Sequence, residues 1–157
     1  MSVLYGIIFV VSLLMIVVYF LVDKKHDPWL LMLFICVAVC DSGYFLLSVA
    51  NNLNFALWAN RIAYLGNIFL PFAILMMIMS LSRFSYPKYL PRVLISINLI
   101  MLFIVSSGGL LPIYYKNVSF EIVNGIGTLV KEYGILHNLY KVFLFGYFVA
   151  MSVIIIY

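Results

Sequence analysis

Eight polar or charged side chains lie inside strongly apolar stretches of this sequence. Such residues are costly in a membrane and usually face the interior of a helix bundle, where they pair or line a cavity. Because carboxylates in this setting need a cation, we expect Asp41 to pair with Arg61 on an adjacent antiparallel helix. The eight residues are Asp41, Asn60, Arg61, Asn67, Asn98, His137, Asn138 and Lys141.

The cations of this set have two interpretations, and both stay open. Arg61 and Lys141 can extend their long side chains to the lipid headgroups. Alternatively, with Asp41 they line a polar pocket in the outer half of the bundle, whose surplus positive charge suits a small anionic or carbonyl-bearing ligand. Asn60, Asn67 and Asn98 are either hydrogen-bonding links between helices or ligand contacts. His137 alone does not indicate a metal site.

Catalytic and metal-binding patterns are absent from the sequence. It contains no HExxH, no Gly-x-Ser-x-Gly and no close carboxylate pair, and it has five acidic residues in all. Cys36 and Cys40 lie one helical turn apart and lack the further ligands that zinc requires, so we interpret them, with Gly43, as small residues packed between helices. We expect no enzyme activity, no cofactor and no metal in this chain.

The elements that position the polar residues are transmembrane helices. Of the 157 residues, 67% are hydrophobic and 9% charged, more apolar surface than a soluble domain of this size can bury. We predict one domain over 1–157, an all-α polytopic bundle. Because the last apolar run continues to the end, we expect the five helices of this bundle to be a fragment of a longer protein. The predicted helices are 3–22, 29–50, 56–82, 90–111 and 134–157.

The third apolar run organises the bundle. Trp58–Phe84 exceeds the ~20 residues that a span needs and carries Arg61 near its start. Pro71 lies in mid-run, where a proline removes a backbone hydrogen bond. We therefore expect this helix to bend, which widens a cavity beside it.

Loop charges predict the orientation in the plasma membrane. Lysine and arginine lie in the 23–28 and 83–92 loops, whereas the 51–57 loop has no charge. By the positive-inside rule the basic loops are cytoplasmic and the N-terminus is outside. The net charge of +4 therefore reflects topology and not nucleic-acid binding.

The 112–133 segment is then an outer loop with a pattern of its own. Two alternating stretches flank Asn124-Gly125, the dipeptide most typical of a two-residue hairpin turn. We predict a short extracellular antiparallel hairpin that packs its apolar face on the helix ends, because an isolated hairpin is marginal in water.

A more specific pattern runs through the third helix. Trp58-x-x-Arg61-x-x-Tyr64-Leu65-Gly66-x(4)-Pro71, followed by an apolar run and a basic loop, resembles the third helix of the seven-helix N-terminal sensor region of bacterial histidine kinases and some diguanylate cyclases. Further pieces that fit are Gly43-Tyr44, Tyr133-Gly134, His137 and Tyr140. The resemblance spans the chain as the first five helices of seven.

The resemblance implies a membrane sensor module. A signal from outside or within the bilayer is received in the outer half and passed to a cytoplasmic kinase or cyclase domain that this chain does not contain. The bundle is expected to form a homodimer and to move its bent third helix. Two alternatives stay open: a small transporter component, which would show an internal repeat, and a structural subunit of a membrane complex. The expected ligand-binding residues are Asp41, Arg61, Tyr64, Asn67, His137 and Lys141.

Overall fold

The computed structural model describes residues 2–22, 27–82 and 84–156. The described residues form a helical bundle with one small antiparallel hairpin, which confirms the predicted fold class. The elements are α1 (Ser2–Val22), α2 (Pro28–Ser48), α3 (Leu53–Leu81), α4 (Leu90–Ser106), β1 (Tyr115–Val123), β2 (Ile126–Tyr133) and α5 (Leu136–Ile156).

Four of the helices, α1, α2, α3 and α5, are long and apolar enough to cross a membrane. The fourth helix, α4, has 17 residues and ends at Ser106, so the predicted range 90–111 was too long. The cause is local, because Gly109 adopts a φ of +83°, a left-handed conformation that suits glycine and ends a helix. Four spans with one shorter apolar helix define a multi-pass membrane protein.

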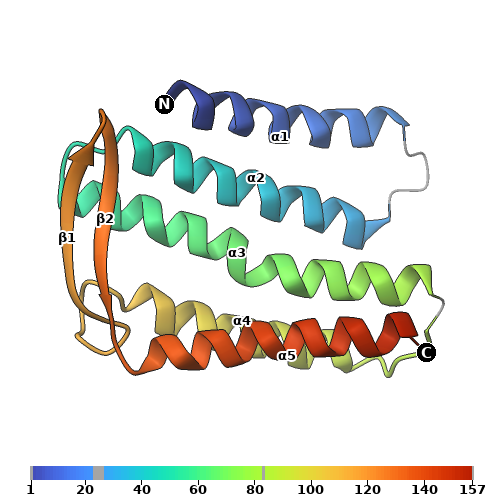
Figure 1. Ribbon diagram of the computed structural model, residues 1–157. Helices are drawn as coiled ribbons and strands as arrows, with labels where there is room; N and C mark the ends of the chain where they lie inside the picture. Colours follow the sequence, from blue (N-terminus) through green and yellow to red (C-terminus); the bar gives the residue numbers. More distant parts are fainter. Residues whose placement is uncertain (1, 23–26, 83, 157) are drawn as a thin grey trace.

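The third helix lies at the centre of the bundle. Figure 1 shows α1, α2 and α3 side by side, with α4 and α5 on the far side of α3. The hairpin lies across one end of the bundle, near the start of α1, and the C-terminus lies at the other end. We call these the hairpin end and the opposite end.

Two of the helices begin at side-chain caps. The Asp27 carboxylate accepts hydrogen bonds from the amides of Trp29 and Leu30, at 2.8 and 3.4 Å, and Pro28 occupies the first turn of α2. The Asn52 side chain accepts from the amide of Phe55 at 2.8 Å and starts α3. Both caps satisfy amides that have no partner within the helix.

Small residues allow α2 and α3 to pack closely. A Cβ on Gly43 would lie 2.2 Å from the Ala63 nitrogen, and one on Gly66 would lie 2.5 Å from the Cys36 carbonyl oxygen. The backbone of Cys36 and the backbone and Cβ of Cys40 lie at this contact, which agrees with the interpretation of both as small residues packed between helices.

The predicted bend in the third helix is present. Pro71 lies inside α3 and cannot donate to the carbonyl of Asn67, four residues earlier. The axis of α3 changes direction near its middle in Figure 1. The bend divides α3 into a part near the hairpin and a part near the opposite end.

The core also has two parts. Near the hairpin, Ile68, Met101 and Val105 pack with the buried rings of Tyr114 and Tyr115. Toward the opposite end the core is formed by Phe72, Leu75, Met76, Met79 and Tyr147.

One polar contact crosses the second core. The Tyr147 hydroxyl donates to the side-chain oxygen of Asn98 at 2.9 Å, and both residues are buried. Asn98 thus links α4 to α5, as expected of a hydrogen bond between membrane helices.

The hairpin follows the predicted turn. Asn124 and Gly125 have φ values of 52° and 76°, and Val123 pairs with Ile126 across them, which is a two-residue turn with left-handed backbone at both positions. Gly127 then lies against α2, where an added Cβ would be 2.6 Å from the Leu47 carbonyl oxygen. The hairpin therefore packs on the helix ends, as predicted.

Candidate functional site

Lys131 is the residue through which the hairpin reaches into the bundle. Side chains alternate along a strand, so Gly127, Leu129 and Lys131 share the face of β2 that lies on the helices. The Lys131 ammonium donates a hydrogen bond of 2.7 Å to the side-chain oxygen of Asn60, which is 5% exposed on α3. A single charge-assisted bond thus joins the hairpin to the central helix.

Two tyrosine rings surround the same ammonium. Its nitrogen lies 5.6 Å from the ring centroid of Tyr64 on α3 and 5.4 Å from that of Tyr115 on β1. Both distances are within the range of cation–π attraction, which is stronger where water is excluded. The charge of Lys131 is therefore stabilised by ring faces and one amide oxygen.

Phenol hydroxyls extend this contact into a network. The Asn60 amide nitrogen donates to the Tyr115 hydroxyl at 3.3 Å, and Tyr115 donates to the Tyr64 hydroxyl at 3.2 Å. The Tyr114 hydroxyl also donates to that of Tyr64, at 3.4 Å. The Tyr64 hydroxyl thus accepts hydrogen bonds both from β1 and from the turn that precedes it.

The start of α5 closes another side of the cluster. His137 stacks on Tyr133 with ring centroids 3.8 Å apart, and Tyr140 meets Tyr64 edge to face at 5.8 Å. The Nδ1 atom of His137 is buried and has no hydrogen-bond partner among the described residues. The imidazole therefore retains an unused polar atom beside the tyrosines.

Asn67 of α3 lies on the side of the cluster that faces α2. Its side-chain oxygen accepts from the Cys40 thiol at 3.1 Å, and its amide nitrogen donates to the Tyr44 hydroxyl at 3.3 Å. Tyr44 also lines a cavity of about 240 Å³, which we call the hairpin cavity. The cavity lies between α1, α2 and β2, and among its lining residues are Tyr5, Tyr44, Ser48, Thr128 and Lys131.

Burial determines the protonation of the hairpin residues. It lowers the pKa of the Lys131 ammonium from its ordinary 10.5 to about 8. It raises the pKa of the Tyr114, Tyr115 and Tyr133 phenols, so these rings stay neutral and act as hydrogen-bond donors and acceptors. An anion or carbonyl oxygen next to Lys131 would favour the charged ammonium.

Three of the six residues predicted from the sequence meet in this cluster, namely Tyr64, Asn67 and His137. The other three lie elsewhere. Lys141 is exposed on α5, and the Asp41 carboxylate forms no hydrogen bond or ion pair with a described residue.

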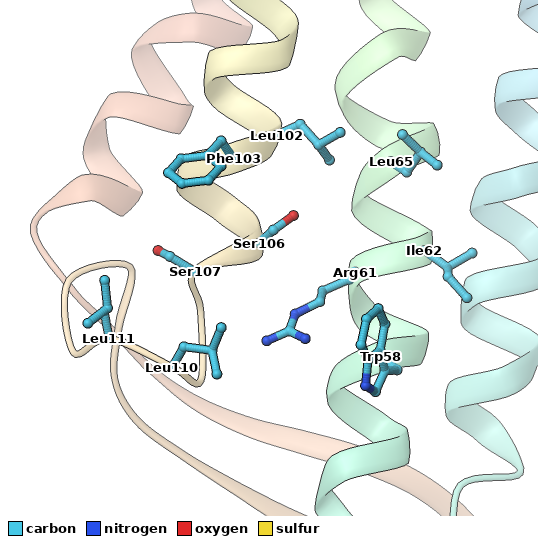
Figure 2. A pocket seen from close by; sticks show the side chains of 10 residues that line it. All are labelled: Trp58, Arg61, Ile62, Leu65, Leu102, Phe103, Ser106, Ser107, Leu110 and Leu111. Atoms are coloured by element: carbon cyan, nitrogen blue, oxygen red, sulfur yellow. The ribbon is translucent and has the colours of Figure 1, made fainter.

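The expected pair of Asp41 with Arg61 was wrong. The Arg61 guanidinium lies 5.0 Å from the ring centroid of Trp58, in a groove between α3 and α4 (Figure 2). Asp41 belongs to α2, which packs on a different side of α3. Helix depth placed the two residues at similar levels, but the rotation of α3 points Arg61 toward α4.

Sequence reasoning missed Lys131 as a site residue, together with Tyr114 and Tyr115. The alternation of side chains along β2 could have revealed it. Lys131 is a charged residue on the same face of the strand as Gly127 and Leu129. A charge on the apolar face of a predicted hairpin needs a partner below it. Asn60 had been noted as a polar residue of the third helix, and it is that partner.

The fold and this cluster define a class: a multi-pass helical membrane protein with a polar, aromatic site beneath a hairpin. Within that class, the family described as the N-terminal 7TM region of histidine kinase matches residues 4–157, and the chain belongs to this family. The family is a non-catalytic membrane sensor region of histidine kinases. Comparisons with curated proteins and with solved structures gave no match.

Proposed function

We propose that this chain is the signal-receiving module of a histidine kinase and that it receives its stimulus at the hairpin end. Family membership and the position of the cluster support the proposal. Lys88 and Arg92 lie at the opposite end, before α4 and in its first turn. In the sequence, Lys24 and Lys25 fall between α1 and α2 and Arg83 follows α3, but these three lie outside the described residues. The positive-inside rule then makes the opposite end cytoplasmic and the N-terminus and hairpin extracellular.

The bond between Lys131 and Asn60 is the observation that carries the proposal. It ties a surface hairpin to the central helix by one charged contact of 2.7 Å. Because the ammonium faces both Asn60 and the hairpin cavity, a ligand in the cavity competes with Asn60 for the same donor. Binding at the surface thereby changes a contact of α3.

The chemistry of the cavity favours a small anionic or carbonyl-bearing ligand. Lys131 supplies a cation, and Tyr44, Ser48 and Thr128 supply hydroxyls around the same space. Tyr64 and Asn67 contact the lining residues Lys131 and Tyr44, and His137 stacks on Tyr133 in the adjoining cluster. In this proposal Asp41, Arg61 and Lys141 are not ligand contacts.

We propose that the signal passes through the bundle by a shift between two of its states. A ligand shifts helices only if it binds the two states with different affinity. In one state Lys131 donates to Asn60, and in the other it donates to the ligand. The hairpin-side part of α3 then loses its charged contact with β2 and shifts about the bend at Pro71. We propose that α3 transmits this change through α4 and α5 to a cytoplasmic output domain, and that the module works as a homodimer.

The test measures basal output of the full-length protein in proteoliposomes, as autophosphorylation with ATP. Lys131→Met and Asn60→Leu each break the bond, and both should change basal output in the same direction. We expect a change of about fivefold or more, because fivefold is the lower limit of ordinary coupling between two sites. Asn60→Asp replaces an amide with an ion pair and should change output in the opposite direction.

Lys116→Met is the matched control, since Lys116 lies on β1 and is exposed. It should leave basal output at the wild-type level. Wild-type output in both Lys131→Met and Asn60→Leu would refute the proposed coupling, provided both variants insert and purify as the wild type does.

A further inference from the structure

A second cavity lies on the other side of α3 from the hairpin cavity. It is a groove of about 570 Å³ between α3 and α4, which we call the lateral groove (Figure 2). Its wall is apolar, with Leu65 on α3, Leu102 and Phe103 on α4 and Leu110 in the following turn. Phe103 and Leu110 are 81% and 74% exposed, so the groove opens outward from the bundle toward lipid.

One charge lies in this apolar surface. The guanidinium of Arg61 makes no hydrogen bond or ion pair with a described residue, and its Nε atom is buried without a partner. Figure 2 shows the side chain extending from α3 toward Leu110 across the groove. Of the five N–H donors of a guanidinium, the one on Nε is buried here without an acceptor, which is costly.

The depth of Arg61 matches that of a lipid headgroup. At 1.5 Å per residue, the 29 residues of α3 span roughly 43 Å, and Arg61 lies roughly 12 Å from its start. The hydrocarbon core is about 30 Å thick, so Arg61 is a few ångströms inside its edge and its side chain can reach the phosphates. Trp58, one turn nearer the end and 63% exposed, is at the level where interfacial tryptophans lie.

We propose that the lateral groove binds an anionic phospholipid, with the headgroup phosphate on Arg61 and one acyl chain between α3 and α4. A planar guanidinium matches a phosphate in two parallel hydrogen bonds. Among the described residues, Arg61 is the charged side chain of the lining and no acidic side chain lines the groove, so the site favours a net negative charge. An apolar helix of this or another chain would fill the groove but leave Arg61 without an acceptor.

The experiment uses the full-length protein in nanodiscs of phosphatidylcholine with phosphatidylglycerol. A phosphatidylglycerol with a photoreactive group in its acyl chain is compared with the matching phosphatidylcholine probe, and crosslinked positions are mapped by mass spectrometry. We expect groove positions such as Leu102 and Phe103 to be labelled about fivefold more by the anionic probe, the factor that one basic residue near a membrane surface contributes. The exposed face of α1 around Val10 should be labelled equally by both probes.

Variants of Arg61 test whether this side chain causes the preference for the anionic probe. Arg61→Gln should remove the anionic preference of the groove and leave the α1 labelling unchanged, whereas Arg61→Lys should retain part of it. Equal labelling of the wild-type groove by the two probes would overturn the proposal and needs no variant. Three further results would also overturn it. Arg61→Gln could keep the anionic preference, or the groove could remain unlabelled because protein covers it. Excess inorganic phosphate could also abolish the labelling.

Discussion

The two parts of α3 on either side of Pro71 differ in what they contact. The hairpin-side part carries Asn60, Tyr64 and Asn67, which make hydrogen bonds to the hairpin and to α2. The other part buries Phe72 and Met76, each 0% exposed, in an apolar core with one polar contact across it.

Under the proposed function, this difference suits the two parts of α3 to different roles. Hydrogen bonds and cation–π contacts are directional and can be exchanged for contacts with a ligand, so the hairpin side is suited to reception. Close-packed apolar side chains resist small displacements and move as a unit, so the other side is suited to transmission. Three predictions probe the contacts of the two parts and of the elements packed on them, from the largest expected effect to the smallest.

The largest effect should follow from filling the contact between α2 and α3. Gly43→Ala places a Cβ 2.2 Å from the Ala63 nitrogen, a backbone atom that cannot move without shifting α3. Overpacking costs about 1–3 kcal/mol, and we expect the upper end or loss of the folded protein, measured by thermal unfolding in detergent. Gly146→Ala is the control, because nothing lies within 4 Å of its added Cβ. Equal melting of the two variants would contradict the close packing.

A smaller effect should appear with pH at the hairpin. The unfolded chain keeps the Lys131 proton up to a pKa near 10.5, whereas the folded chain releases it near 8. The unfolded state therefore binds more protons between these values, and stability should rise with pH by at most about 1.4 kcal/mol per unit. The tyrosines limit this rise above pH 10, because their raised pKa keeps them protonated only in the folded state.

The measurement for this prediction is the thermal midpoint at a series of pH values from neutral to 10. Lys131→Met should lose the rise between pH 8 and 10, and Lys116→Met should keep it. If the midpoint of Lys131→Met rises with pH as in the wild type, another group titrates in that window.

The smallest effect on stability should come from single phenol hydroxyls, and here the two parts of α3 should differ in output. Tyr147→Phe removes the bond to Asn98, and Tyr115→Phe removes those to Asn60 and Tyr64. Each bond is worth about 0.6 kcal/mol in a membrane protein, so both variants should melt close to the wild type. Only Tyr115→Phe should change basal autophosphorylation; an equal change in Tyr147→Phe would remove the distinction between the two parts.

Much of the architecture could be predicted because it depends on local chemistry. Composition and run length are enough to indicate membrane helices, since lipid requires every backbone group to be bonded within the helix. Asn124-Gly125 predicts the hairpin turn because few other residues accept a positive φ at both positions. The end of α4 was missed, although Gly108-Gly109 after Ser107 was available as a termination pattern.

The candidate site was only partly predictable. Asn67 and His137 were found because polar residues in apolar runs face inward, a rule that needs no neighbours. Tyr64 was found through the resemblance of Trp58-x-x-Arg61-x-x-Tyr64-Leu65-Gly66 to the sensor family. The same rule grouped Asp41 with Arg61, because it estimates depth along a helix and not rotation about it. Within an apolar run the sequence has no polar stripe that reports rotation.

Residue types within one or two turns were thus enough to predict membrane helices, the hairpin turn, the bend at Pro71 and the small residues with which α2 packs on a neighbouring helix. The tertiary structure alone decided that Lys131 binds Asn60, 71 positions away, and that Arg61 turns from Asp41 toward the lateral groove. Both outcomes depend on how α3 is rotated against its neighbours. That rotation results from the packing of all the elements together, and no local pattern encodes it.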